Sequence, residues 1–263
     1  MLADNAESGR EHAVSRRILM LLPDLDFDPS ETGVPWRLAR DAGHDVVFAT
    51  ETGAAGKADP IVLDGVIFGL LGPSEEARRD YEEMARDAAY NTPLRWEDVD
   101  ADDFDALFLP GGHAKGMCPY FESAKLHDVV GAFFRANKPV GAVCHGTLLA
   151  ARSRDSATGQ SVLYGRRTTC LPKYMERSAW LSTAWKMGRY FRTYDEYVED
   201  EVLEALGPSG VYERGPIHLF AKGSSVDHGP THVVRDGNYV SARWPGDVYA
   251  IGEVFASMVS ALS

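Results

Sequence analysis

Four short apolar runs are distributed through the first half of the chain. Each is built mostly of Ile, Leu, Val, Phe and Ala, and such runs form strands that are buried on both faces of a parallel sheet. They are residues 18–22, 46–49, 106–109 and 139–143. Between the first two runs, Ser30 is the expected N-cap of a helix on which Val34, Leu38 and Ala42 share one face. The pattern predicts a βαβ unit within a doubly wound, mostly parallel α/β sheet that has helices on both faces.

Helical and hairpin patterns continue along the chain. Residues 74–89 and 129–134 have helical patterns, and residues 232–235 and 239–242 predict a hairpin with a Gly-Asn turn. Residues 248–262 predict a closing amphipathic helix. Its inward positions are Val248, Ile251, Phe255, Met258 and Leu262.

The alternation of strands and helices stops at about residues 170–206. Two aromatic-rich helical segments, 179–191 and 196–206, occur there. One face of the first carries Trp180, Ala184, Met187 and Phe191. This face is interpreted either as helix packing or as a cap over a substrate cleft. We therefore expect a disordered tail at residues 1–15 and one domain over 16–263 with a helical cap.

Composition places the chain among ordinary globular proteins. It has 263 residues, of which 44% are hydrophobic and 25% charged, and its formal net charge is −12. Because this charge repels other anions, neither a nucleic acid nor an anionic membrane is an expected partner. No stretch approaches the roughly 20 apolar residues that span a bilayer, and residues 1–15 contain no apolar run. We expect a cytoplasmic protein.

The cysteines argue for reactive chemistry rather than cross-links. The chain has three of them, Cys118, Cys144 and Cys170. An odd and sparse set does not form a disulfide framework and fits a reducing compartment. No pair has the spacing of metal ligands, so no metal site is expected.

The strongest chemical signal is the segment from Pro139 to Gly146, which reads Pro-Val-Gly-Ala-Val-Cys-His-Gly. A strand of small residues ends at Cys144 and a helix follows at once, which is the context of a nucleophile elbow. The nearby helix N-terminus is expected to lower the pKa of the thiol. The alternative is a buried structural cysteine.

Two other segments are expected at the same edge of the sheet, because parallel strands end together. Gly111-Gly112-His113 follows the strand 106–109, so the backbone N–H groups of Gly112 and His145 are candidates for an oxyanion hole. Glu31 lies in the first turn of an earlier helix. From its position alone, Glu31 is best interpreted as an acid favoured by the helix dipole.

Three motifs in this order resemble the ThiJ/PfpI superfamily, which includes the Parkinsonism-associated deglycase, PfpI proteases and chaperone-glyoxalases. They are Glu31-Thr-Gly-Val-Pro35 with Leu38-Ala-Arg-Asp-Ala-Gly43, Asp105-Ala-Leu-Phe-Leu-Pro-Gly-Gly-His113, and Ala142-Val-Cys144-His145-Gly146. The stretch from Asp236 to Asp247 is similar to the closing strand and helix of that family. The resemblance covers about residues 16–153 and 230–262.

This resemblance implies a flavodoxin-like sheet and a set of roles. Cys144 is then the nucleophile, His145 its adjacent base or orienting residue, and Glu31 an acid hydrogen-bonded to the sulfur. In the chaperone-like branch an aspartate completes a Cys-His-Asp triad, whereas this chain has Lys173 at the corresponding place. Glu176, Asp195 or no residue at all takes that role here.

Two related classes of enzyme are disfavoured. A class I glutamine amidotransferase needs a His-x-Glu pair after the elbow, and a serine hydrolase needs Ser in place of Cys144. The segment 174–206 is also unlike that of short family members, so the substrate cannot be carried over.

The preferred hypothesis is a cofactor-independent cysteine enzyme that acts on a small carbonyl-type or otherwise electrophilic substrate. Glyoxalase-like conversion of a 2-oxoaldehyde is the leading reaction, followed by hydration or hydrolysis. The alternative is a redox-sensing or chaperone protein in which Cys144 is oxidised rather than turned over. We expect His113, Trp180 and Trp185 to line the substrate pocket, and part of the surplus aromatic residues to form a homodimer contact.

Overall fold

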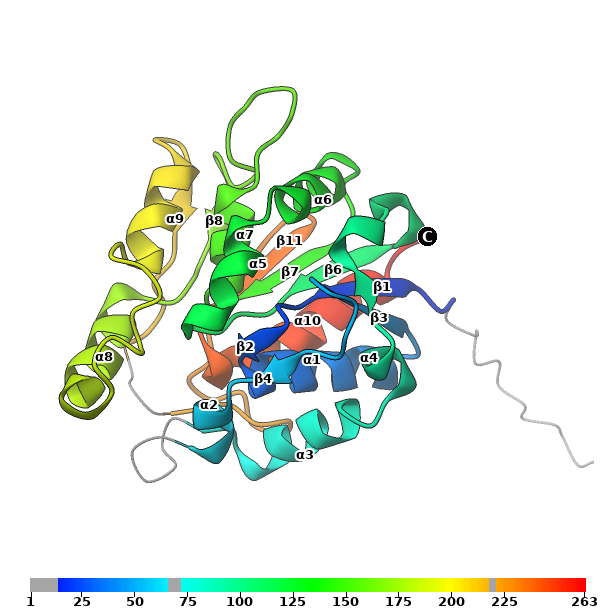
Figure 1. Cartoon of the computed structure of the whole chain (residues 1–263). Helices are drawn as coiled ribbons and strands as arrows, with labels where there is room; N and C mark the ends of the chain where they lie inside the picture. The colour runs from blue at the N-terminus through cyan, green and yellow to red at the C-terminus, as the bar shows by residue number, and fades with distance from the viewer. Residues whose placement is uncertain (1–13, 66–71, 218–220) are drawn as a thin grey trace, which may run out of the picture.

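The computed structural model describes residues 14–65, 72–217 and 221–263. Seven of the described strands form one twisted sheet in the order β10-β11-β7-β6-β1-β3-β5, in which β10 and β11 are antiparallel and every other pair is parallel (Figure 1). The strands are β1 (Arg17–Leu21), β3 (Asp45–Thr50), β5 (Leu94–Arg95), β6 (Ala106–Leu109), β7 (Val140–Val143), β10 (Val233–Asp236) and β11 (Tyr239–Ala242). The predicted mostly parallel, flavodoxin-like α/β sheet is confirmed.

Helices cover both faces of this sheet. On one face α1 (Pro29–Asp41) packs against α10 (Val248–Ser260) and α3 (Glu75–Met84), and on the other α6 (Ala124–Arg135) packs beside α7 (Gly146–Arg152) (Figure 1). The short helices α2 (Pro60–Asp64), α4 (Ala88–Asn91) and α5 (Cys118–Glu122) lie in the connections. None of the helices within the described ranges is both long and apolar enough to cross a bilayer.

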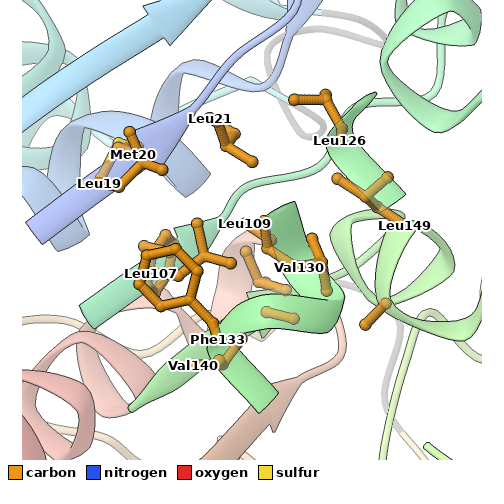
Figure 2. Packing of buried hydrophobic residues seen from close by; sticks show 14 of the residues in the cluster. Leu19, Met20, Leu21, Leu107, Leu109, Leu126, Val130, Phe133, Val140 and Leu149 are labelled. Carbon is orange, nitrogen blue, oxygen red and sulfur yellow. The ribbon is translucent and has the colours of Figure 1, made fainter. Parts of the chain in front are cut away.

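The core explains why the apolar runs are strands. Leu107, Leu109 and Val140 are fully buried, and they pack under Val130 and Phe133 of α6 (Figure 2). Because every side chain of these short parallel strands meets a helix on one face or the other, both faces need apolar residues. The predicted strands at 18–22, 46–49, 106–109 and 139–143 agree with the structure within one residue at each end.

Some local predictions were wrong, each for a local reason. The N-cap of α1 is Asp28, not Ser30, because the Asp28 carboxylate accepts hydrogen bonds from the backbone N–H groups of Ser30 (2.8 Å) and Glu31 (3.1 Å). The helix expected over 74–89 ends at Met84 and a second short one follows. Two small two-stranded sheets were not predicted. They pair β2 (Leu25–Phe27) with β4 (Lys57–Ala58) and β8 (Arg167–Thr168) with β9 (Val211–Tyr212).

The segment expected to form a cap contains α8 (Lys173–Met187) and α9 (Val198–Leu206). These helices contact each other, and α9 contacts α7. They form a layer of their own beside the sheet, at the left in Figure 1. The loop 188–197 connects them and returns toward the carboxyl ends of β6 and β7. Residues 1–13 of the expected disordered tail lie outside the described residues, and the single domain over 16–263 stays a prediction.

Candidate functional site

The chain makes a tight turn between β7 and α7, and Cys144 lies at its apex. Cys144 has a positive φ of 56°, and His145 is the N-cap of α7. A side chain at position 146 would place its Cβ 2.1 Å from the carbonyl oxygen of Leu109, so only glycine fits. The positive φ of Cys144 lies in the left-handed region, where a non-glycine residue is strained and persists only when its surroundings impose it. The strand-to-helix turn that the sequence predicts at Cys144 is confirmed.

His145 lies between two side chains that use its two ring nitrogens. Its Nδ1 is 3.5 Å from the Cys144 sulfur, and its Nε2 is 3.2 Å from Oγ1 of Thr193 in the loop 188–197. Burial, followed by the neighbouring His113, lowers the pKa of His145 to about 3. The imidazole is therefore neutral near pH 7 and can accept a proton.

Glu31 lies beside the thiol, as expected. The backbone N–H of Gly111 donates to its Oε2 at 2.9 Å, whereas its buried Oε1 has no regular hydrogen-bond partner. The Cys144 side chain is among the contacts that affect the pKa of Glu31, so the two groups approach closely without an aligned hydrogen bond. Burial first, and then the charge of Asp28, raise the pKa of Glu31 well above its usual range. Glu31 therefore holds a proton in the resting site.

The electrostatics of the thiol differ from the sequence-based expectation. Burial, followed by the charges that Glu31 and Asp28 carry when they are ionised, raises the pKa of Cys144 well above its usual value. The backbone N–H of His145 acts in the other direction. The start of α7 therefore acts on the thiol pKa in the expected direction, but burial outweighs it, and the net direction is upward. Cys144 and Glu31 each hold a proton in the resting site.

The glycines after β6 allow the motifs to meet. A Cβ at Gly111 would lie 2.7 Å from Oε2 of Glu31 and 2.8 Å from the backbone nitrogen of His145, so a larger residue would separate these groups. Gly112 and His145 both line the cavity at Cys144. Their role as oxyanion donors stays a prediction.

A cavity of about 270 Å³ opens over the Cys144 thiol. One wall consists of acid and base groups, and the opposite wall is mostly apolar and comes from the cap. The apolar wall is formed by Val62, Leu171, Met175, Ala179, Phe191, Trp244 and Pro245. His113 also lines the cavity, as expected, and its ring stacks on that of Phe191 at 4.3 Å between centroids.

Two aromatic residues expected in this pocket are not there. Trp185 is 83% exposed, and neither it nor Trp180 lines the cavity. The helical repeat of α8 explains the error, since Met175, Ala179 and Ser182 form the face toward the cavity and the tryptophans fall on other faces. Phe191, which we expected on the same helical face, lies beyond the end of α8 and provides the aromatic wall instead.

Neither carboxylate considered as the third member of a triad contacts His145. Glu176 accepts a hydrogen bond from the backbone N–H of Val198 and pairs with Arg192 at 3.6 Å, although it does line the cavity. Asp195 has a side chain that is 92% exposed and pairs with Arg189. At Nε2, the partner of His145 is the hydroxyl of Thr193.

Sequence reasoning also missed Asp28, Lys222 and Trp244 as lining residues. Burial raises the pKa of Asp28 to about 6 and lowers that of Lys222 from its usual value. Asp28 could have been found, because it precedes a Pro-Ser-Glu helix start in the family-like motif. Lys222 lies in a connection without a recognisable pattern. Trp244 belongs to the stretch from Asp236 to Asp247, which resembles the closing strand and helix of the family, and it lines the cavity as well.

The other cysteines are separate from this site. Cys118 is partly buried and Cys170 is buried, and both are free. Within the part of the chain that the structure describes, no group of three or more His, Cys, Asp and Glu side chains is arranged to hold a metal ion.

Comparison with known proteins identifies the family. Residues 22–216 match the profile described as ThiJ/PfpI family-like. This chain belongs to the ThiJ/PfpI family. A deglycase of Pyrococcus abyssi is 26% identical over 243 residues, which are 92% of this chain and 99% of that protein. Glyoxalase 3 of Candida albicans is 23% identical over 193 residues, 71% of this chain and 79% of that protein.

Solved structures share the fold of this chain. Glyoxalase III from Candida albicans has a TM-score of 0.68 at 20% identity, and the match covers 94% of this chain and 98% of that one. DJ-1beta of Drosophila melanogaster has a TM-score of 0.58 at 18% identity, with 95% and 92% covered. At these identities the likeness concerns the sheet and its helices.

Proposed function

We propose that this ThiJ/PfpI protein is a cysteine-dependent enzyme that converts a 2-oxoaldehyde into a 2-hydroxy acid. The observation that carries the proposal is the position of the Cys144 sulfur, between a neutral imidazole and a protonated carboxyl at the base of a cavity. Relatives named deglycase and glyoxalase support an enzyme of this type.

The three side chains suffice for the proton transfers of this reaction. As the sulfur of Cys144 bonds to the aldehyde carbon, its proton passes to Nδ1 of His145, and the carbonyl π electrons move to oxygen. The backbone N–H groups of Gly112 and His145 are the proposed donors to that oxygen. The acidic proton of Glu31 is available to the substrate's oxygens.

The remaining steps need no external oxidant. The hydrogen on the aldehyde carbon moves as a proton to the neighbouring ketone carbon, which leaves a thioester to the sulfur and a hydroxyl next to it. Water then cleaves the thioester and restores the thiol. In sum, RCOCHO and H₂O give RCH(OH)COOH, in which one carbon is oxidised and its neighbour reduced, so no redox cofactor is part of the proposal.

The cavity also supports a substrate with an apolar group. The wall opposite Cys144 includes Met175, Phe191 and Trp244, so an alkyl or aryl substituent on the oxoaldehyde would lose contact with water there. The 7% exposure of Cys144 favours such a small molecule over an unfolded protein chain, which would need a broad exposed apolar surface.

Turnover of methylglyoxal and phenylglyoxal, with the hydroxy acid identified by NMR, tests the proposal. We expect Cys144→Ser to lower kcat/KM by at least about a thousandfold, since the covalent path is lost. Cys118→Ser is the matched control, because Cys118 does not line the cavity. Equal rates for the wild type and Cys144→Ser would refute the proposal. A parallel assay with an amine-glyoxal adduct tests the deglycase reaction at the same thiol.

We also propose that the chain forms a homodimer. Leu181 and Trp185 of α8 are 57% and 83% exposed, and together they present an apolar strip on the outer face of the cap. Light scattering at micromolar concentration is the test, and a monomer would contradict the homodimer proposal. A cytoplasmic location, with neither nucleic acid nor membrane as partner, remains the expectation from sequence.

A further inference from the structure

The Thr193 hydroxyl makes two contacts, and these define where its hydrogen lies. Oγ1 is 2.6 Å from the carbonyl oxygen of His113 and 3.2 Å from Nε2 of His145. A carbonyl oxygen only accepts hydrogen bonds, so at 2.6 Å the single hydroxyl hydrogen must point to His113. The opposite orientation would leave two acceptor oxygens in close contact.

This arrangement determines the tautomer of His145. Because the hydroxyl hydrogen of Thr193 is donated to the carbonyl oxygen of His113, Oγ1 can only accept a hydrogen bond from Nε2. Nε2 must therefore carry a hydrogen. A neutral imidazole has one N–H, so Nδ1 is left as the acceptor. Nδ1 is the nitrogen that faces the Cys144 sulfur at 3.5 Å.

We propose that Thr193 is a positioning residue that holds His145 in the Nε2–H tautomer, so that Nδ1 can take the proton of the Cys144 thiol. It makes the contact to Nε2 of His145 that a carboxylate was expected to make. A hydroxyl orients the ring as a carboxylate does, but it adds no negative charge to stabilise an imidazolium. The thiol therefore stays protonated at rest, and its proton moves as the bond to the substrate forms.

The cap determines where Thr193 lies. Its side chain is on the loop 188–197, and neighbouring side chains hold this loop together and attach it to α8 and α5. Arg192 pairs with Glu176 and lies 3.6 Å above the ring of Tyr197, and the Tyr194 hydroxyl donates to Glu122 at 2.8 Å. The cap thus supplies both the apolar wall and the group that orients the base.

Thr193→Val tests this role because it removes the hydroxyl and keeps the shape. Thr193→Ser restores the hydroxyl. Thr183→Val is the matched control, since Thr183 is also a buried threonine of the cap but its hydroxyl bonds only to carbonyls of its own helix. The first readout is the rate of iodoacetamide alkylation at Cys144, measured by mass spectrometry between pH 5 and pH 10.

We expect Thr193→Val to slow alkylation at pH 7 and kcat by at least about tenfold, with KM changed by less than about twofold, because only proton transfer is affected. Thr193→Ser should recover most of both rates, and Thr183→Val should resemble the wild type. Unchanged alkylation in a folded Thr193→Val protein would overturn the proposal.

A second measurement needs no variant. Nitrogen-15 NMR of the wild-type protein should show a hydrogen on Nε2 of His145 and none on Nδ1 near pH 7, and the reverse tautomer would also overturn the proposal. The expected change in kcat rests on the proposed function, whereas the alkylation and NMR measurements do not. If oxoaldehydes are not turned over but both other readouts respond as expected, the proposed reaction fails and the role of Thr193 stands.

Discussion

The elbow and the cap build the site in different ways. The elbow places Cys144, His145 and Gly146 in consecutive positions, and all three are buried. The cap reaches the same cavity through a helix whose outer face leaves Trp185 83% exposed, and through a loop that follows it. The nucleophile is thus held by backbone geometry inside the core, whereas the wall and the orienting hydroxyl depend on how a peripheral layer docks. Substitutions at the elbow should therefore affect mainly the stability of the fold, and substitutions in the cap mainly selectivity and assembly.

The largest effect is expected at the elbow. Gly146→Ala would place a methyl group against the Leu109 carbonyl, a backbone atom that cannot move without shifting β6. We expect a loss of about 3 kcal/mol or more in the free energy of unfolding, because overpacking against backbone is not relieved by a rotamer change. Urea unfolding measures this loss. Gly159→Ala, where a Cβ meets nothing within 4 Å, is the control and should cost about 1 kcal/mol from its positive φ. Equal costs at the two positions would contradict the steric argument.

The second effect concerns the pH dependence of stability at the elbow. The pKa of His145 is about 3 in the folded chain and near 6.5 when unfolded, so the unfolded chain binds the extra proton between these values. The contribution of neutral His145 is complete above pH 6.5 and is lost as the pH falls toward 3. Between pH 6.5 and pH 4, wild type should lose about 2 to 3 kcal/mol more than His145→Gln, at roughly 1.4 kcal/mol per pH unit. Parallel stability curves for the two proteins would show that His145 is already charged when folded.

A smaller effect, on selectivity, is expected at the cap. Ala179→Phe adds a ring to the apolar wall and should lower kcat/KM for phenylglyoxal about tenfold, while methylglyoxal is affected less than about twofold. The ratio of the two kcat/KM values is the measurement. Ala184→Phe, on the same helix but absent from the cavity lining, is the control. A parallel loss for both substrates would mean that α8 moves as a whole, and that the cap does not select by size.

The smallest effect is expected on the outer face of the cap. Trp185→Ala removes a ring that is 83% exposed and does not line the cavity. We expect kcat/KM within about twofold of wild type, because the ring does not line the cavity, whereas the proposed homodimer should weaken, because the ring belongs to its contact. Steady-state kinetics and light scattering measure the two effects. A large loss of activity would show that Trp185 contributes to the site after all.

The parts of the site that sequence reasoning found lie in continuous motifs. Cys144 and Gly146 were recognised because a small-residue strand followed at once by a helix start leaves few conformations for the turn. Glu31 needed the family resemblance, since its position alone favoured a helix-dipole role. The prediction that Trp180 and Trp185 line the pocket was wrong, because helical spacing shows which residues share a face but not which face points to the cavity.

The sequence alone therefore determined the parallel sheet, the elbow and the family, because burial of apolar runs and the steric limits of a turn act between near neighbours in the chain. Tertiary structure decided which distant side chains meet. Thr193 is 48 residues from His145, and only the docking of the loop 188–197 makes it the partner of that ring instead of Glu176 or Asp195. It also decided the protonation of Cys144 and Glu31, because desolvation depends on what the rest of the fold packs around them.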